Sequence, residues 1–426
     1  MKKVMYQSRA TEERLSEIGL NSTIWIGDRK APNRVVHQPV ECNDSFSGFP
    51  SELTLNRYQR LAEARAGITI VEATAVASSS ISRLHQLIAD EQHRAGIEKL
   101  TSEFKEINQD TILCYQLAHS GQISDPRFSE VVRLYESEDS PTAVGRKLET
   151  SEIRRIRDAF IKGAEIVHDS GADMVDIKLC HGFFGSQILR PANTRNDEYG
   201  GSLDNRMRFA KEVIEGIKEN ISDPNFKVMT RFSIYEGTTT VDGEPIPIMG
   251  GVGTKGPEST EFSLDEPHEM LKILVDYGVD ILNITGGVIF PPKIPKEFRM
   301  DNPQSYLTYQ QLGFARGVKE LKLGIPVICS GFSVFGENIS KVGRNSILHG
   351  YTDMVGIGRQ ALADPDIKRI LAGNAKYCTR CRGCNELLAA QMPTGCTHHD
   401  PVYAAIREST RLLPTLKKEP SSNIRK

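Results

Sequence analysis

The sequence predicts an α/β protein: a (β/α)8 TIM barrel with a cysteine-rich extension at its C-terminal end. Eight short apolar runs rich in Val and Ile alternate with longer segments of helical periodicity. The chain has 426 residues, 39% of them hydrophobic, which suits a barrel of this size. Alternation implies parallel strand pairing, and a count of eight favours a closed barrel over the alternative, a doubly wound open sheet.

The predicted strands follow one another at fairly even intervals along the chain. Each is short and rich in β-branched residues, as expected of strands that are buried on both faces. In chain order they cover residues 33–40, 67–76, 111–118, 173–179, 227–233, 279–285, 325–330 and 354–358.

The predicted helices fill the segments between these strands. Ser151 and Ser202 precede two of them and can serve as N-caps. Two connections, 236–262 and 286–305, are unusually long and rich in Gly and Pro. Both follow strands, so we expect them to wall or cover a pocket at the active-site face of the barrel. The helices are expected at 53–67, 89–108, 151–171, 205–221, 264–278, 307–323, 336–348 and 365–373.

Composition excludes several classes of protein. A formal net charge of −2 argues against a nucleic-acid or anionic-membrane partner held by bulk charge. No apolar run approaches the roughly 20 residues of a membrane span, and the polar start lacks the apolar core of a signal peptide. We therefore expect a cytoplasmic protein whose eight cysteines are thiols or ligands rather than disulfides. Its predicted parts are an N-terminal arm (1–30), the barrel (31–375) and a cysteine-rich segment with a tail (376–426).

The stretch around the fourth strand indicates an enzyme. Lys178 and His181 straddle the end of this buried strand, where a barrel enzyme keeps its chemistry. The motif continues through Arg190-Pro191 and Tyr199-Gly200-Gly201-Ser202 to Asn205-Arg206.

This long, ungapped motif resembles the active-site segment of the old yellow enzyme family of FMN-dependent ene-reductases. In that family two histidines hydrogen-bond the activating oxygen of the substrate; Lys178 takes the place of the first and His181 that of the second. The resemblance implies hydride transfer between reduced FMN and an activated C=C bond of a small carbonyl or acyl compound, or the reverse oxidation. It also implies NAD(P)H as electron donor and a homo-oligomer.

The resemblance also assigns an FMN site at the strand ends. Gly331 and Gly358-Arg359 follow the seventh and eighth strands, where barrels build phosphate sites and where the family holds the FMN phosphate. Gln116 matches the glutamine at the pyrimidine edge, and Arg231 the arginine set against flavin N1 and the C2 oxygen. The residues expected to contact the ring through their backbone are Gln38, Pro39, Val40, Glu41, Glu72 and Ala73.

Three positions depart from the family pattern. Phe183 stands where the family has its proton-donating tyrosine, so the proton would come from His181, Lys178, another tyrosine such as Tyr235, or water. Lys178 in place of a histidine suggests a more anionic substrate oxygen; the alternative is an ion pair with Asp176. Glu41 would lie beside the flavin C4 oxygen and N5, unless it is turned toward solvent.

Four cysteines cluster near the C-terminus: Cys378, Cys381, Cys384 and Cys396. Tight triplets with two-residue gaps suit a cubane cluster, in which each iron takes one thiolate, whereas zinc more often uses two separated CxxC pairs. Their position after the barrel resembles trimethylamine dehydrogenase and 2,4-dienoyl-CoA reductase, which bind a [4Fe–4S] cluster there. The prediction is iron–sulfur, with zinc as the alternative. Electrons would then come from a partner protein or from NAD(P)H.

The sequence thus predicts an NAD(P)H:flavin oxidoreductase with Lys178 and His181 as catalytic residues. The rival is a flavin-free barrel lyase or aldolase in which Lys178 forms a Schiff base and the cysteines hold structural zinc.

Overall fold

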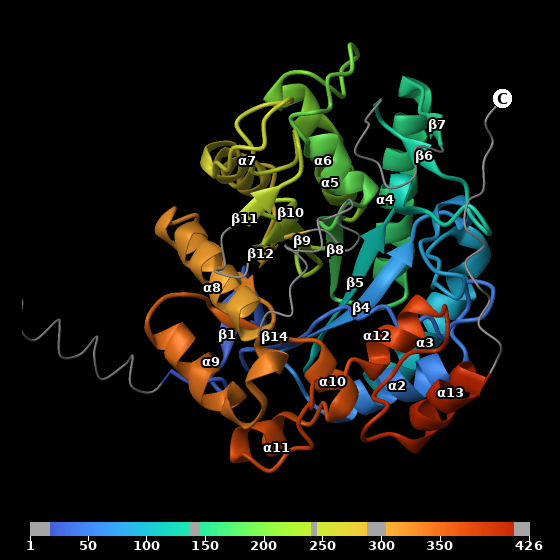
Figure 1. Ribbon diagram of the computed structural model, residues 1–426, viewed down its shortest axis with the longest axis vertical. Coiled ribbons are helices and arrows are strands. Elements are labelled where there is room, and N and C mark those ends of the chain that lie inside the picture. The colour runs from blue at the N-terminus through green and yellow to red at the C-terminus, as the bar shows by residue number, and fades with distance from the viewer. Residues whose placement is uncertain (1–17, 136–144, 240–244, 288–303, 413–426) are drawn as a thin grey trace, which may run out of the picture.

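The computed structural model describes residues 18–135, 145–239, 245–287 and 304–412, and its centre is a closed barrel of eight parallel strands (Figure 1). Every predicted strand segment contains one of them, so the (β/α)8 prediction is confirmed and the open sheet is excluded. The strands are β3 (Val35–His37), β4 (Ile68–Ala75), β5 (Ile112–Ala118), β8 (Met174–Leu179), β9 (Lys227–Ser233), β12 (Ile281–Thr285), β13 (Val327–Cys329) and β14 (Met354–Ile357), and β14 pairs with β3 to close the barrel.

Helices surround the barrel, as predicted. Ser202 caps α6 by accepting a hydrogen bond from Asn205 N at 3.2 Å. The cap predicted at Ser151 is wrong: α4 begins one residue earlier, because Glu149 and Glu152 form a capping box there. The surrounding helices are α2 (Glu52–Glu63), α3 (Arg94–Ile107), α4 (Thr150–Asp169), α6 (Leu203–Asn220), α7 (Asp265–Asp276), α8 (Gln304–Glu320), α9 (Ile339–Leu348) and α11 (Ile367–Ala372); short α5 (Phe184–Leu189) and α10 (Arg359–Ala363) follow β8 and β14.

The barrel interior is filled with side chains and closed at its amino end. Val36, Ile70 and Met229 belong to this interior cluster. A hairpin of β1 (Ile24–Ile26) and β2 (Arg29–Ala31) adds Ile24, Ile26 and Ala31 to the same cluster. The hairpin lies mostly in the predicted N-terminal arm, of which residues 1–17 are outside the described part. Because the amino end is plugged, the opening of the barrel is at the carboxyl ends of its strands.

The loops that connect the barrel strands and helices contain short strand pairs and 3-10 turns. Within the long connection after β9, β10 (Gly237–Thr239) pairs with β11 (Pro245–Pro247), and β6 (Val132–Arg133) pairs with β7 (Arg146–Lys147). Most of the other long connection, residues 288–303, lies outside the described residues. The 3-10 turns are η1 (Ser78–Ser80), η2 (Glu91–His93), η3 (Gly121–Ile123) and η5 (Phe332–Asn338).

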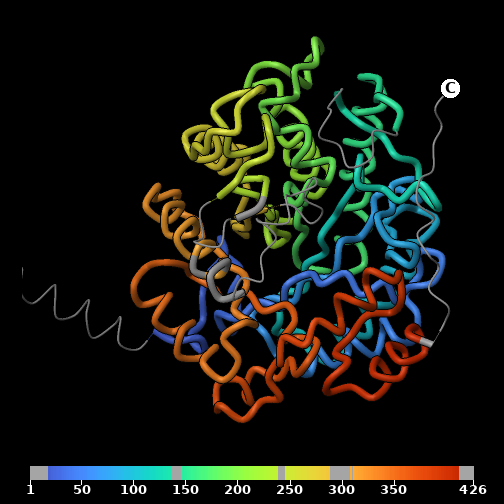
Figure 2. The backbone as a smooth tube through the Cα atoms, viewed as in Figure 1, coloured from blue at the N-terminus to red at the C-terminus, as the bar shows by residue number. Residues whose placement is uncertain are grey.

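The C-terminal segment folds back onto the first part of the barrel. Its helices α12 (Gly383–Ala389) and α13 (Pro401–Leu412), red in Figure 2, lie beside the blue α2. Arg60 of α2 forms an ion pair with Asp400 at 3.2 Å, and Thr394 N donates to Cys42 O at 2.7 Å. None of the helices in the described residues combines the length and apolar character needed to cross a bilayer; the cytoplasmic location stays a prediction.

The buried His37 leads to a prediction about acid stability. Its ring nitrogens contact Thr69 Oγ1 at 3.1 Å and the Pro365 carbonyl at 3.2 Å. Burial lowers the pKa of His37 to about 4, although the Pro365 carbonyl opposes the shift. Because the unfolded chain binds a proton near pH 6.5 and the folded one only near 4, this group contributes stability above pH 6.5 that is lost as the pH falls toward 4.

We expect His37→Gln to reduce the acid sensitivity of the fold. The free energy of unfolding should fall between pH 7 and pH 4.5 by about 2–3 kcal/mol more in the natural protein than in the variant. Urea unfolding at both pH values measures this difference. Equal losses in the two proteins would contradict a neutral, buried His37.

Candidate active site

Lys178 lies at the mouth of the barrel in a row of alternating charges. Its Nζ donates to Glu41 Oε1 at 2.9 Å, and Glu41 Oε2 accepts from Arg83 Nε at 3.0 Å. Burial by itself would raise the pKa of Glu41, but Lys178 and Arg83 outweigh burial and hold that pKa at about 2. Glu41 is therefore an ionised carboxylate that faces Lys178 rather than solvent. We call these residues the Arg83–Glu41–Lys178 row.

Asp176 is not the hydrogen-bonding partner of Lys178. Its Oδ2 accepts from Gln116 Nε2 at 2.6 Å, and its Oδ1 accepts from the Arg231 backbone N at 2.7 Å. Burial raises the pKa of Asp176, while Gln116 and Arg231 oppose that effect. Asp176 thus joins the ends of β5, β8 and β9 and orients the two residues that the sequence assigns to the flavin.

His181 begins a strained turn after β8. Its φ of 63° is left-handed, and its backbone N donates to Ser233 Oγ at 3.0 Å. The ring Nε2 lies 3.1 Å from Thr285 Oγ1. Burial and the charges of Arg231 and Lys178 hold the pKa of His181 well below its ordinary value. His181 is therefore a neutral imidazole at pH 7, which can hydrogen-bond a substrate oxygen but is not the imidazolium acid that the sequence suggested.

Phe183 and Tyr235 are the two aromatic residues that bear on proton donation. The Phe183 ring is buried against Ala73 and Ala118, and the Lys178 Nζ lies 3.3 Å from its centroid. Phe183 thus stabilises the Lys178 ammonium through a cation–π contact, but it has no hydroxyl and cannot donate a proton. Tyr235 packs outside the barrel against Phe262 and Phe314, and its hydroxyl lies 3.4 Å from Gln310 Oε1 on α8. Tyr235 thus contacts the helical layer, and its role as a proton donor stays a prediction.

Arg231 carries one buried polar atom, its Nε, that has no hydrogen-bond partner among the described residues. The Arg231 backbone, by contrast, is fixed by Asp176. An unsatisfied guanidinium nitrogen is costly in a protein interior. An anionic acceptor at this point would remove that cost, and the electron-rich edge of a flavin has the required chemistry. The arrangement of Arg231 fits the cofactor that the sequence implies.

The turns after β13 and β14 also suit a cofactor end group. Gly331 has a φ of 97°, and a Cβ there would lie 2.8 Å from Thr308 Oγ1, so a side chain is strongly disfavoured. The backbone N atoms of Gly358 and Gln360 donate to Ser333 Oγ at 3.1 and 3.0 Å. Ser333, which the sequence did not single out, therefore joins the two turns.

The side chain of Gln38 is hydrogen-bonded inside the barrel. Its amide exchanges two hydrogen bonds with Asn283, at 3.2 and 3.0 Å, and Asn283 also accepts from Ser330 Oγ at 3.3 Å. The Gln38 side chain is thus committed to the barrel interior. Its backbone N donates to Ile357 O at 2.9 Å, which leaves its backbone carbonyl for a ring contact. Pro39 and Val40 continue this segment, and Ala73 is buried beside Phe183.

All four C-terminal cysteines line one small cavity, together with Arg359 and Leu362. Each is a free thiol. Gln360 fixes the start of this segment by accepting from Cys378 N at 3.0 Å. Among the described residues, no three His, Cys, Asp or Glu side chains converge closely enough to hold a metal ion. The structure therefore brings the four thiols around one cavity without drawing them to a single point.

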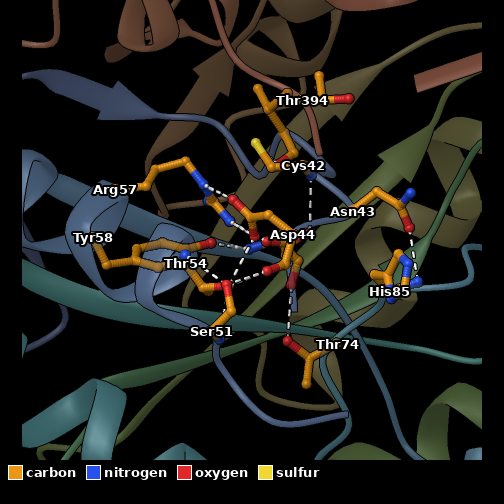
Figure 3. A network of polar contacts seen from close by, with 12 residues as sticks. Cys42, Asn43, Asp44, Ser51, Thr54, Arg57, Tyr58, Thr74, His85 and Thr394 are labelled. Carbon is orange, nitrogen blue, oxygen red and sulfur yellow. Dashed lines mark hydrogen bonds and ion pairs between the residues drawn. The ribbon is translucent and has the colours of Figure 1, made fainter. Parts of the chain in front are cut away.

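A buried polar network connects this segment to the barrel (Figure 3). Thr394 N donates to Cys42 O, and Cys42 N donates to Glu72 Oε2 at 3.0 Å. Arg57 then bridges Glu72 and Asp44, at 2.5 and 2.7 Å. Burial, with a smaller contribution from Asp44, raises the pKa of Glu72 to about 7, against the opposing effect of Arg57. The Glu72 side chain belongs to this network, and its backbone is also engaged: its N donates to Tyr58 Oη at 2.8 Å, and its O accepts from Thr74 Oγ1 at 2.9 Å. The ring contact expected of Glu72 stays a prediction.

Three features of the site escaped sequence reasoning: Arg83, Asp176 as an organising residue, and an Arg190–Glu236 ion pair at 2.6 Å. The Ser-Arg-Leu context of Arg83 carries no recognisable signal. Glu236 opens a long Gly-rich loop, and that position was the one available hint.

Comparison with known proteins identifies a matching family. The family model described as the NADH:flavin oxidoreductase / NADH oxidase family matches residues 20–245, more than half of the chain. An NADPH dehydrogenase from Bacillus licheniformis is 28% identical over 345 residues, covering 78% of this chain and 88% of that protein.

Two solved structures share the fold. A 2-naphthoyl-CoA reductase in complex with 2-naphthoyl-CoA has a TM-score of 0.76 at 20% identity over 92% of this chain. A histamine dehydrogenase from Rhizobium sp. 4-9 has a TM-score of 0.70 at 24% identity over 91%. This chain covers only 58% and 52% of those two longer chains. At these identities the likeness shows the fold alone.

Proposed function

The chain belongs to the NADH:flavin oxidoreductase / NADH oxidase family, and on that premise we propose the following function for residues 31–375. They form an FMN-dependent oxidoreductase that acts on the activated C=C bond of a small carbonyl or acyl compound, or catalyses the reverse oxidation. The observation that carries the proposal is the buried Arg83–Glu41–Lys178 row beside the neutral His181.

When bound, FMN supplies the hydride chemistry that side chains lack. Arg231 would stabilise negative charge on the reduced ring through its unpartnered Nε, and Gln116, fixed by Asp176, would bind the pyrimidine edge. The residues proposed to hold the cofactor are Gln38, Pro39, Val40, Glu41, Ala73, Gln116, Arg231, Gly331, Gly358 and Arg359.

Lys178 and His181 are the proposed catalytic residues. The Lys178 ammonium is held by Glu41 and lies against the Phe183 ring, so its direction is fixed before a substrate arrives. His181 is neutral and presents an imidazole whose orientation Thr285 sets. Together they would bind the substrate oxygen and stabilise the negative charge that develops on it.

The charges favour a substrate with an anionic or strongly polarised oxygen. Lys178 places a buried cation, held by Glu41, at the end of β8 where the substrate would bind. A carboxylate, thioester or enolate oxygen would complement this cation better than a neutral ketone. One structurally similar protein is a reductase of a CoA thioester, so acyl thioesters belong in the first substrate screen.

Half-reactions followed without oxygen test the proposal. The purified protein should carry a flavin whose visible absorbance is lost on addition of NADH or NADPH. Adding an α,β-unsaturated acyl thioester or enone should restore that absorbance. A colourless protein that takes up no FMN on reconstitution would contradict the proposal.

The rival function, a Schiff-base lyase, is less compatible with the geometry. A lysine that forms a Schiff base needs a free amine lone pair to attack a carbonyl, whereas Lys178 Nζ is a hydrogen-bond donor to the ionised Glu41 at 2.9 Å. Failure of borohydride to trap a carbonyl substrate on Lys178 would agree with this reading.

We further propose that residues 376–426 hold a [4Fe–4S] cluster through Cys378, Cys381, Cys384 and Cys396. The support is that these four thiols line one cavity and follow one another at the spacing that suits a cubane. A zinc ion at about 2.3 Å from each sulfur would draw four thiolates together. A cubane, whose irons take one thiolate each, keeps them apart with the cluster between. Zinc remains the alternative.

Metal analysis of protein purified without oxygen distinguishes the two. We expect about four irons and four sulfides per chain, and a substantial loss of both in Cys384→Ser. Cys114→Ala, which alters a buried thiol of the barrel interior, is the control and should keep the full iron content. Stoichiometric zinc with no iron would contradict the cluster.

Electrons would enter from NAD(P)H or from a partner protein. Flavin reduction by NAD(P)H alone, as rapid as turnover, would make a partner unnecessary. A homo-oligomer remains a prediction that sedimentation can test.

A further inference from the structure

Glu236 is a buried carboxylate at the start of the long connection after β9, and it is 0% exposed. Its Oε2 accepts from Arg190 Nε at 2.6 Å, and its Oε1 accepts from Arg190 Nη2 at 3.1 Å. Arg190 comes directly after α5 and is also buried. The pair is therefore a two-point contact inside the protein, between two segments that both leave the active-site end of the barrel.

The same carboxylate contacts the turn that carries His181. Glu236 Oε1 accepts from Gly182 N at 3.1 Å, a donor shared with Ser186 Oγ at 3.0 Å. His181 and Gly182 are consecutive left-handed residues, with φ of 63° and 77°. A non-glycine residue persists in this conformation only when its surroundings hold it there. Glu236 supplies the charged part of that support.

Glu236 also organises its own loop. Its backbone N donates to Val252 O at 2.8 Å, and its backbone O accepts from Ile248 N at 2.9 Å. Ala192 N, two residues beyond Arg190, donates to Gly250 O at 3.0 Å. The loop, the segment after α5 and the His181 turn thus meet at one buried side chain.

We propose that Glu236 and Arg190 are positioning residues that set the orientation of the His181 imidazole toward the substrate. The catalytic meaning of this role rests on the function proposed above, whereas the positioning itself can be measured without turnover. Neither residue touches the reacting atoms in the proposal. They act through the Gly182 amide and the loop backbone.

Glu236→Gln is the informative variant because it keeps the size of the side chain. In the natural protein Oε1 accepts from both Gly182 N and Arg190 Nη2, and Oε2 accepts from Arg190 Nε. A glutamine keeps an acceptor oxygen at only one of these two positions, so its NH2 group would face either Arg190 Nε or the Gly182 amide, both of which are donors. Arg190→Met/Glu236→Met is the second variant: it removes both buried charges together, which proteins tolerate better than an unpaired charge.

Glu266→Gln is the matched control. Glu266 forms a similar two-point contact with Arg206, at 2.6 and 2.9 Å, between α7 and α6. It does not contact the His181 turn, so it reports the cost of losing a carboxylate–arginine pair elsewhere in the fold.

NMR of protein with 13C-labelled histidine rings provides the readout, with the His181 signal assigned from a His181→Gln variant. In the natural protein and in Glu266→Gln, the His181 signal should not titrate between about pH 5 and 8. In Glu236→Gln, and in the double variant, His181 should titrate within that range because the turn opens to solvent. A folded Glu236→Gln protein with an unchanged His181 signal would overturn the proposal, and so would an unchanged signal in the folded double variant.

Turnover gives the second readout. Both variants should retain FMN and lose at least about tenfold in kcat, while Glu266→Gln keeps its kcat. If the natural protein shows no flavin-dependent turnover, but the His181 signal of Glu236→Gln titrates between about pH 5 and 8, the proposed function fails and the positioning role stands. If kcat per bound flavin is unchanged in both variants, the positioning role is overturned while the function stands.

Discussion

Replacing Lys178 with methionine should lower kcat/KM by about 10²–10³-fold while the protein keeps its FMN. This is the usual effect of removing one donor that stabilises a developing oxyanion. The methionine fills a similar volume but removes the charge that Glu41 fixes at 2.9 Å and that Phe183 supports. Steady-state kinetics, normalised to bound flavin, measure the change.

Two variants make the Lys178 result specific. Lys178→Arg keeps the charge but not the shape, and we expect an intermediate activity. Lys227→Met alters another buried lysine of the barrel, at the opposite end of the strands, where it pairs with Asp28; it should change stability without changing kcat/KM. A Lys178→Met enzyme with more than half of the natural activity would contradict the proposed oxyanion role.

Replacing Arg231 with methionine should lower the reduction potential of the bound flavin. A hydrogen bond to a charged group contributes about 1.5–3 kcal/mol, which corresponds to roughly 30–65 mV for a two-electron couple. The direction follows from the charge: without the cation, the anionic reduced ring loses stabilisation more than the neutral oxidised ring does. Equilibration with redox dyes in the absence of oxygen measures the potential.

Arg231→Lys is the control for this prediction, because it keeps the positive charge while changing the donor geometry. Its potential should lie closer to that of the natural protein than to that of Arg231→Met. If the potential of Arg231→Met stays within about 10 mV of the natural value, the unpartnered Nε of Arg231 does not face the flavin, and the proposed cofactor position is wrong.

The predicted and observed elements agree best where the signal is local. Alternating apolar segments located all eight strands, and Ser202 was found as the cap of α6. The predicted start of α4 differs from the observed one: α4 begins at Thr150, because a Glu149–Glu152 capping box takes the place of the Ser151 cap. The short α5 and α10, of six and five residues, are too brief to show helical periodicity.

The sequence by itself determined the barrel and the residues at its strand ends, because hydrophobic periodicity is local and closure brings the carboxyl ends of parallel strands to one face. It could not determine the charge state of the site. Glu41 is 137 positions from Lys178 and 42 from Arg83. Only the folded barrel shows that these three side chains meet in a buried space, where mutual contact keeps the carboxylate ionised. Burial, together with the charges of Arg231 and Lys178, lowers the pKa of His181 and keeps it neutral.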